Sequence, residues 1–423
     1  MNAVVRIVWI VVIFSVTTVG WFVLGGVMSS RTSQQESALS GKVADLWGTP
    51  QSQPAPSLRL HWQTEEHVMD LIEDPQTKTY VSQERTVLQD VSEAVHLSSS
   101  TVAVDVDLDA RRKGLLWFSL YDVDFDAVYQ YTHPSDSISC NLEIIFPFPE
   151  ATGLYDNFRF VIDGEVDEGL QPEAGRVQAM VAVEPGQEVE IAVGYRSRGA
   201  DSWTYLPSQG VAALNNFSLS MTTDFDEIDF PAYTLSPSSK AASGDGWALR
   251  WDFDRVVTGH GVGMTMPQHI QPGLLAQQMS FSAPISLGFF FLILFVLSVL
   301  KRIPIHPINY MMLAGSFFSF HLLFAYSADH LPVAAAFALS ALTSVGLVVS
   351  YLRLVISSRF AFGPAAIAQL IYLIGFSLAH FWDGYTGLTV TVLSIATLFV
   401  LMQLTGRVNW EAELKNARRQ LPG

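Results

Sequence analysis

The chain has 423 residues, of which 49% are hydrophobic and only 15% charged, and its Asp and Glu outnumber its Lys and Arg by 40 to 24. A net charge of −16 argues against a protein that binds nucleic acid through a basic surface. There is one cysteine, Cys140, so an intramolecular disulfide is excluded and any folded domain must be held together by its core.

The chain opens with an apolar stretch over residues 4–28. About 20 apolar residues are enough to cross a hydrocarbon core of roughly 30 Å. A cleaved signal peptide is the alternative, but its apolar region is only about 7–15 residues long, and no A-x-A cleavage site follows this stretch. We therefore predict an uncleaved transmembrane anchor over residues 1–30.

Residues 31–280 are polar and carry 15 Lys and Arg against 36 Asp and Glu. Their dominant pattern is alternation, as where Val102, Val104 and Val106 alternate with Asp, which predicts a strand with one solvated face. Similar patterns occur in residues 115–131, 137–148, 217–225 and 246–256, and a hairpin is expected around Pro185-Gly186. We predict a mostly β, sandwich-like domain with helices at about 34–46 and 83–95.

Two features of this domain could carry chemistry. Asp105, Asp107 and Asp109 have the spacing that begins a calcium loop, but Ala110 stands where glycine is needed, and a solvated strand face is the alternative. Cys140 could be a reactive thiol, although its place on an apolar strand face favours a small buried hydrophobe. The sequence shows no nucleophile elbow, paired C-x-x-C or phosphate loop, so we predict a non-enzymatic protein without metal or cofactor.

Five further apolar stretches follow, at residues 281–300, 308–327, 331–352, 362–381 and 385–404. Together with the anchor they predict a membrane protein with six spans, in which residues 281–404 form a C-terminal bundle of five transmembrane helices and residues 405–423 form a tail. The bundle and the anchor contact the lipid bilayer.

The cations that flank these stretches predict the orientation. Alternation of six spans places nine of them on one side, which the positive-inside rule assigns to the cytoplasm. They are Arg6, Lys301, Arg302, Arg353, Arg359, Arg407, Lys415, Arg418 and Arg419. Both termini and the tail are then cytoplasmic, and residues 31–280 are periplasmic.

Polar residues in or beside the spans are candidates for a site, because ionisable groups at membrane depth usually face the bundle interior. His321 lies deep in the third span, and Gln369 lies inside the fifth. We predict an intramembrane or interfacial polar cluster of His321, Asp329, His330, His380 and Asp383. A neutral histidine that only hydrogen-bonds between helices is the structural alternative.

Four short motifs resemble segments of one known family. They are Ala44-Asp45-Leu46-Trp47-Gly48, His306-Pro307-Ile308-Asn309-Tyr310, Ser327-Ala328-Asp329-His330 and Arg407-Val408-Asn409-Trp410. The CreD family of bacterial inner-membrane proteins has a similar Trp-Gly segment after its anchor, a His-Pro-x-x-Tyr segment, a Ser-Glu-His loop and an Arg-x-Asp-Trp ending. This chain departs from the family by Asp329 in place of Glu and Asn409 in place of Asp.

The resemblance implies an inner-membrane protein that supports cell-envelope integrity, linked to a two-component stress response that also affects β-lactam tolerance. We expect a periplasmic domain that binds or stabilises an envelope protein partner, with no role for nucleic acid. A sensor or accessory subunit that signals to a separate cytoplasmic partner is the alternative. A transporter has less support, because no span carries a charged relay or a pair of broken helices.

Overall fold

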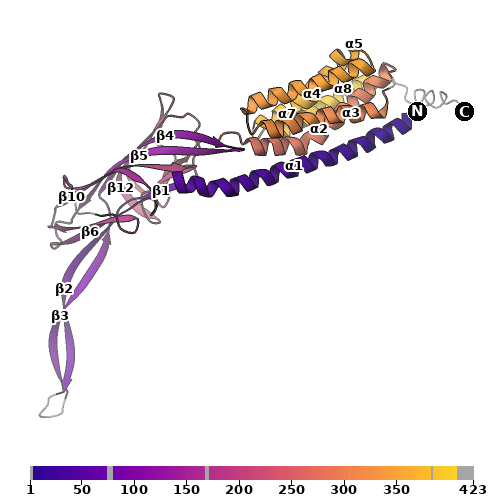
Figure 1. Ribbon diagram of the computed structural model, residues 1–423. Helices are drawn as coiled ribbons and strands as arrows, with labels where there is room; N and C mark the ends of the chain where they lie inside the picture. Colours follow the sequence, from indigo (N-terminus) through magenta and orange to yellow (C-terminus); the bar gives the residue numbers. More distant parts are fainter. Residues whose placement is uncertain (1–2, 74–79, 167–170, 304, 383, 407–423) are drawn as a thin grey trace. The chain divides into compact units, whose positions relative to one another are not determined.

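The computed structural model describes residues 3–73, 80–166, 171–303, 305–382 and 384–406 (Figure 1). The chain divides into two compact units. The membrane unit consists of Met1–Ser40, Arg112–Trp117 and Ile270–Gly423, and the β unit consists of Gly41–Arg111 and Phe118–His269.

Helix α1 runs without a break from Ala3 to Trp47. The sequence predicted an anchor and a second helix at about 34–46, and the structure joins them into one helix. At 1.5 Å per residue only about 20 of its 45 residues are needed to cross a bilayer core. The helix ends because Gly48 adopts a left-handed conformation with φ +86° and donates its N–H to the carbonyl of Ala44, the usual glycine termination.

Five more spans complete the membrane unit, so the described residues contain six helices long and apolar enough to cross a membrane, as predicted. Four are regular helices, and the remaining span, Ser358–Phe381, is built from short segments. The regular helices are α2 (Pro272–Leu300), α3 (Pro307–Ser327), α4 (Val333–Val355) and α8 (Thr386–Thr405).

The irregular span contains two π-helical turns. Its segments are α5 (Ser358–Phe360), η1 (Ala361–Ala365), α6 (Ala366–Gln369), η2 (Leu370–Gly375), α7 (Phe376–Leu378) and η3 (Ala379–Phe381). Pro364 lies in the first π turn, where the missing N–H of proline interrupts the regular ladder. The span therefore departs from a regular helix on both sides of Gln369.

Helix α1 is an integral part of the bundle core. Trp21, Leu24 and Met28 are at most 5% exposed and join the same buried cluster as residues of α2, α3 and α4. The Trp21 indole lies edge-on to Phe318, with ring centroids 5.4 Å apart. Because lipid tails are as apolar as these side chains, close packing rather than hydrophobic burial holds the helices together.

Within the described residues, the β unit has three sheets. One has the strand order β3 (Tyr80–Val95), β2 (Ser57–Glu73), β6 (Cys140–Pro147) and β9 (Arg176–Val183). The largest has the order β13 (Ser239–Ser243), β14 (Gly246–Thr258), β12 (Ala212–Thr223), β4 (Ser99–Lys113), β5 (Leu116–Thr132), β10 (Glu188–Ala200), β7 (Tyr155–Ile162) and β8 (Glu165–Val166). The smallest has the order β1 (Gln51–Pro54), β11 (Ser202–Leu206) and β15 (Val262–Thr265).

The mostly β prediction is confirmed, and the alternation in β4 explains how the core forms. Val102, Val104 and Val106 are each 1% exposed, while the intervening aspartates face outward. Phe125 of the eight-stranded sheet packs against Phe146 of the four-stranded sheet, with ring centroids 6.5 Å apart. The two sheets therefore share one aromatic core, as in a sandwich.

Two local expectations are wrong. Residues 83–95 form strand β3 rather than a helix, because the β-branched Val87, Val91 and Val95 pair across to β2 even though their spacing of four suits a helix. The turn at Pro185-Gly186 does not close a hairpin. It connects β9 to β10, which lie in different sheets and bury their alternate residues in the same core.

Candidate functional site

An ion pair lies at the end of the bundle where α1 leaves the membrane span and α3 ends. The guanidinium Nη2 of Arg31 is 2.6 Å from Oδ2 of Asp329, and the two side chains are 29% and 14% exposed. Arg31 also lies over the ring of Tyr326, 5.0 Å from its centroid. A half-buried pair that also stacks on an aromatic ring fixes α1 against the loop after α3.

The tip of the β4–β5 hairpin belongs to the membrane unit and bonds to this same loop. Arg112 donates from Nη1 to the carbonyl of Leu331 over 3.1 Å and from Nη2 to the carbonyl of Ala328. Gln35 accepts from the N–H of Leu115 over 3.0 Å. The hairpin tip is therefore held against the α3–α4 loop by the hydrogen bonds of the Arg112 guanidinium. Because the donor is charged, these bonds are stronger than neutral ones.

Sequence reasoning singled out Asp329 but missed Arg31 and Arg112 as its neighbours. Arg31 is 298 residues from Asp329 along the chain, and Arg112 is 216 residues from Ala328. A single sequence has no local signal for such pairs.

His321 is buried at 2% exposure in the middle of α3. Its Nδ1 is 3.1 Å from the carbonyl of Phe317 one turn earlier, and its ring lies edge-on to Trp21 with centroids 5.9 Å apart. The contact with Trp21 places His321 at the interface between α3 and α1.

The other predicted cluster residues have separate surroundings. His380 is 5% exposed, and its Nε2 is 2.9 Å from Oγ of Ser282 in α2. His330 is exposed on the α3–α4 loop, and Asp383 lies outside the described residues. Asp329 is engaged by Arg31.

Gln369 forms a third polar contact inside the bundle. Its Nε2 donates to Oγ of Ser344 over 2.9 Å, and Ser344 donates to the carbonyl of Ser316 over 2.6 Å. This chain of hydrogen bonds links the irregular span to α4 and α3. The amide oxygen of Gln369 is buried without a hydrogen-bond partner among the described residues.

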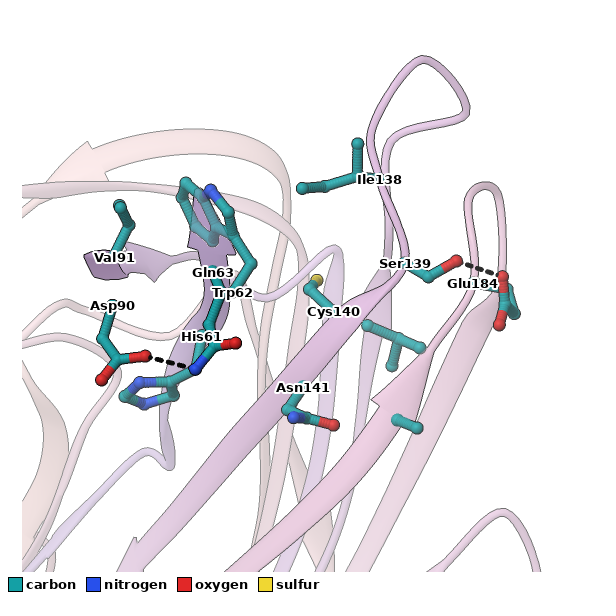
Figure 2. Close-up of a pocket in the computed structure, with 12 residues that line it drawn as sticks. His61, Trp62, Gln63, Asp90, Val91, Ile138, Ser139, Cys140, Asn141 and Glu184 are labelled. Atoms are coloured by element: carbon teal, nitrogen blue, oxygen red, sulfur yellow. Dashed lines mark hydrogen bonds between the residues drawn. The ribbon is translucent and has the colours of Figure 1, made fainter. Parts of the chain in front are cut away.

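The β unit contains an open cleft of about 720 Å³ where two strands separate. Strands β2 and β6 pair from Ser57↔Ile145 to His61↔Asn141, and beyond that point β2 continues only with β3. Figure 2 shows the cleft residues of β2 and β3 facing those of β6 and the segment before it. With the end of β9 and the residue after it, the residues that line the cleft are His61, Trp62, Gln63, Asp90, Val91, Ile138, Ser139, Cys140, Asn141, Ala182, Val183 and Glu184.

Cys140 packs against the core of the β unit from the apolar face of β6, as expected, but it also lines this cleft and is only partly buried. Burial nonetheless raises the pKa of the Cys140 thiol, which keeps it protonated. His133 lies 3.6 Å from the sulfur, but its Nε2 must donate to the carbonyl of Ile138 over 2.8 Å, since a carbonyl only accepts. The imidazole is therefore not free to accept a proton from the thiol, and the pair does not form an activated nucleophile.

The three aspartates of β4 have different environments on the outer face of the strand. Asp105 accepts a hydrogen bond from Thr222, and Asp109 is 2.7 Å from Arg111. Partial burial, together with nearby carboxylates, raises the pKa of Asp107. Across the described residues, no group of three or more His, Cys, Asp or Glu is placed to hold a metal ion.

The family-like motifs fall at structural junctions. His306 caps α3, because its Nδ1 accepts from the N–H of Ile308, and Asn309 in the same motif accepts from the hydroxyl of Tyr351 in α4 over 2.9 Å. Trp47 lies beneath the guanidiniums of Arg111 and Arg198, at 4.1 and 5.1 Å. The fourth motif, 407–410, lies outside the described residues.

Six membrane-spanning helices and a separate β unit define a multi-pass membrane protein with a large extramembrane domain. Residues 281–411 match the model of the family described as inner membrane protein CreD, which confirms the resemblance read from the motifs. The β unit lies outside the matched residues.

No curated protein matches the chain. Among solved structures, a candidate nutrient binding protein from Legionella pneumophila is similar at 11% identity with a TM-score of 0.30, over 44% of this chain and 70% of that one.

Proposed function

We propose that this protein is a non-enzymatic inner-membrane protein that supports cell-envelope integrity through a periplasmic binding domain. In this proposal both termini are cytoplasmic and the β unit is periplasmic, in agreement with the nine cations on one side of the spans. The match of residues 281–411 to CreD supports the membrane location.

The observation that carries the proposal is the cleft of the β unit. It is open, lined by hydrogen-bonding and aromatic side chains, and large enough for a peptide or small ligand. Its thiol has a raised pKa and lies beside a histidine whose proton is committed to a carbonyl, and its Ser139 hydroxyl donates to Glu184. Such a cleft suits binding better than covalent catalysis.

Loss of the gene tests this proposal. We expect the deletion strain to become more sensitive to detergents and cell-wall antibiotics, and to be rescued by the full chain but not by residues 1–30 joined to residues 281–423. The matched control carries alanine at Asp105, which should rescue fully because this residue lies on the outer face of β4 away from the cleft. A deletion strain with a normal envelope and one accumulating metabolite would instead indicate a transporter or an enzyme.

The sensor alternative has one specific observation in its favour. The hairpin tip that carries Arg112 bonds to the loop between two spans, so a change in strands β4 and β5 has a direct route to α3 and α4. Under this alternative, Arg112→Gln would alter the downstream response while leaving ligand binding unchanged. Under the main proposal, the same substitution would only lower stability.

A further inference from the structure

Among the described residues, strand β2 has no paired strand on the side away from β3 over residues 62–68. It pairs with β3 from Leu58 to Glu73 but with β6 only from Ser57 to His61. Beyond His61 the two strands form a ribbon that extends from the rest of the β unit (Figure 1). None of residues 61–70 and 84–95 is fully buried.

A two-stranded ribbon of this length is marginal in water on its own, and an unpaired edge presents a row of N–H and C=O groups that can pair with another strand. The fork between β2 and β6 leaves room for such a strand, because the cleft of about 720 Å³ lies there. A segment bound in the cleft would pair with β2 beyond His61, in line with β6.

The side chains on the two faces of the ribbon indicate which sequence fits. The face that continues the core-facing side of β2 carries Trp62, Val68, Val87 and Val91, and also the carboxylates of Glu66, Asp70 and Glu93. The opposite face carries the carboxylates of Glu65, Glu84 and Asp90, so both faces of the ribbon are acidic. An added strand that carries cations, with apolar residues beside Trp62 and Val68, would complement the ribbon.

Charge also excludes a second copy of this chain as the natural occupant. Asp90 and Glu184 line the cleft, and no Lys or Arg is among its lining residues. The β2 and β3 sequences together contain seven acidic residues and two arginines. Two such edges would repel each other, whereas a basic segment would be attracted.

We infer that the edge of β2 just beyond His61 and the adjoining cleft bind an extended segment of basic and apolar residues from another envelope protein, by adding it as a strand. The inference rests on the proposed function, since it names the kind of partner that the binding domain would hold. Main-chain hydrogen bonds along β2 supply affinity, and the carboxylates supply specificity.

Cys140 supplies a reporter, because it lines the cleft and is the chain's single cysteine. The full chain in lipid nanodiscs is mixed with an eight-residue peptide of alternating lysine and valine, blocked at both ends. We expect saturable binding by fluorescence anisotropy, slower maleimide labelling of Cys140, and slower hydrogen exchange at alternate amides between Trp62 and Val68. Alternate protection is the signature of strand pairing on one edge.

Two controls separate strand addition from general attraction to an acidic domain. The peptide with glutamate for lysine, and the lysine peptide with N-methylated valines, should both fail to bind. The double variant Asp90→Asn/Glu184→Gln should weaken binding about fivefold, the effect of losing two exposed ion pairs. The matched double variant Asp254→Asn/Glu165→Gln makes the same charge change on the eight-stranded sheet and should bind normally.

Three results would overturn the inference: equal binding of the glutamate peptide, binding without protection of β2 amides, or equal weakening in both double variants. The deletion phenotype tests the proposed function separately. A normal envelope in the deletion strain would refute the proposed function even if the peptide bound as expected.

Discussion

The ion pair between Arg31 and Asp329 allows a quantitative test of how α1 is held in the bundle. The atoms Nη2 and Oδ2 are 2.6 Å apart, and the side chains are 29% and 14% exposed. Exposed pairs contribute about 0.2–1 kcal/mol, and breaking a fully buried pair costs about 3–5 kcal/mol. The intermediate exposure places the cost of Arg31→Met at about 2 kcal/mol.

Asp329→Asn should cost less, about 1 kcal/mol, because the amide keeps an oxygen that accepts from Arg31, and the guanidinium still stacks on Tyr326. The double variant should be more stable than the sum of the single losses predicts, because no charge is left without its partner. For a unit of this size, each kcal/mol shifts the midpoint of thermal unfolding by about 2–4 °C.

The assay is thermal unfolding of the purified chain in detergent, with the wild type, both single variants and the double variant in one series. The control cycle uses Arg250 and Asp252, 2.8 Å apart but 61% and 49% exposed, where we expect coupling near the lower limit for surface pairs. Strictly additive effects at Arg31 and Asp329 would refute the reasoning, since they would mean that the contact contributes no coupling energy.

Three further predictions concern topology, the thiol and the buried histidine. A green fluorescent protein fused after Gly423 should fluoresce and an alkaline phosphatase at the same place should be inactive; the reverse would contradict the six-span orientation. A polar maleimide should label Cys140 in the native chain more slowly than it labels a free cysteine, because burial raises the pKa of the thiol and only the thiolate reacts. The labelling rate should rise about tenfold per pH unit below the thiol pKa. A rate that does not depend on pH would exclude this explanation. His321→Gln should retain function, whereas His321→Leu should lower detergent stability by about 0.6–2 kcal/mol; loss of function in the glutamine variant at unchanged stability would indicate proton transfer or ligand binding instead.

The membrane spans and the alternating strands could be predicted because each depends on local composition. Twenty apolar residues in a row, or valines at every second position from Val102 to Val106, have one favourable environment each. Strand β3 was missed because the spacing of Val87, Val91 and Val95 suits a helix, and only pairing with β2 decides the outcome.

The candidate sites depended more on distant contacts. Cys140 lies on an apolar strand as predicted, yet it is partly exposed because β2 and β6 separate beside it. Asp329 was selected from its position beside a span, but its partner Arg31 comes from the opposite end of the sequence. The alternation of apolar and polar residues predicts which face of a strand is apolar. It does not predict where two paired strands separate.

The contact of Arg112 with Ala328 has a consequence for the order of events during synthesis. The two residues are 216 positions apart, so at about 5–20 residues per second the ribosome needs about 10–40 s to make the acceptor after the donor. Strands β4 and β5 can pair early, but their tip has no α3–α4 loop to bind until the third and fourth spans have left the translocation machinery. A late step of maturation is then the binding of an already folded hairpin by newly inserted helices, and chains terminated before residue 328 would never reach it.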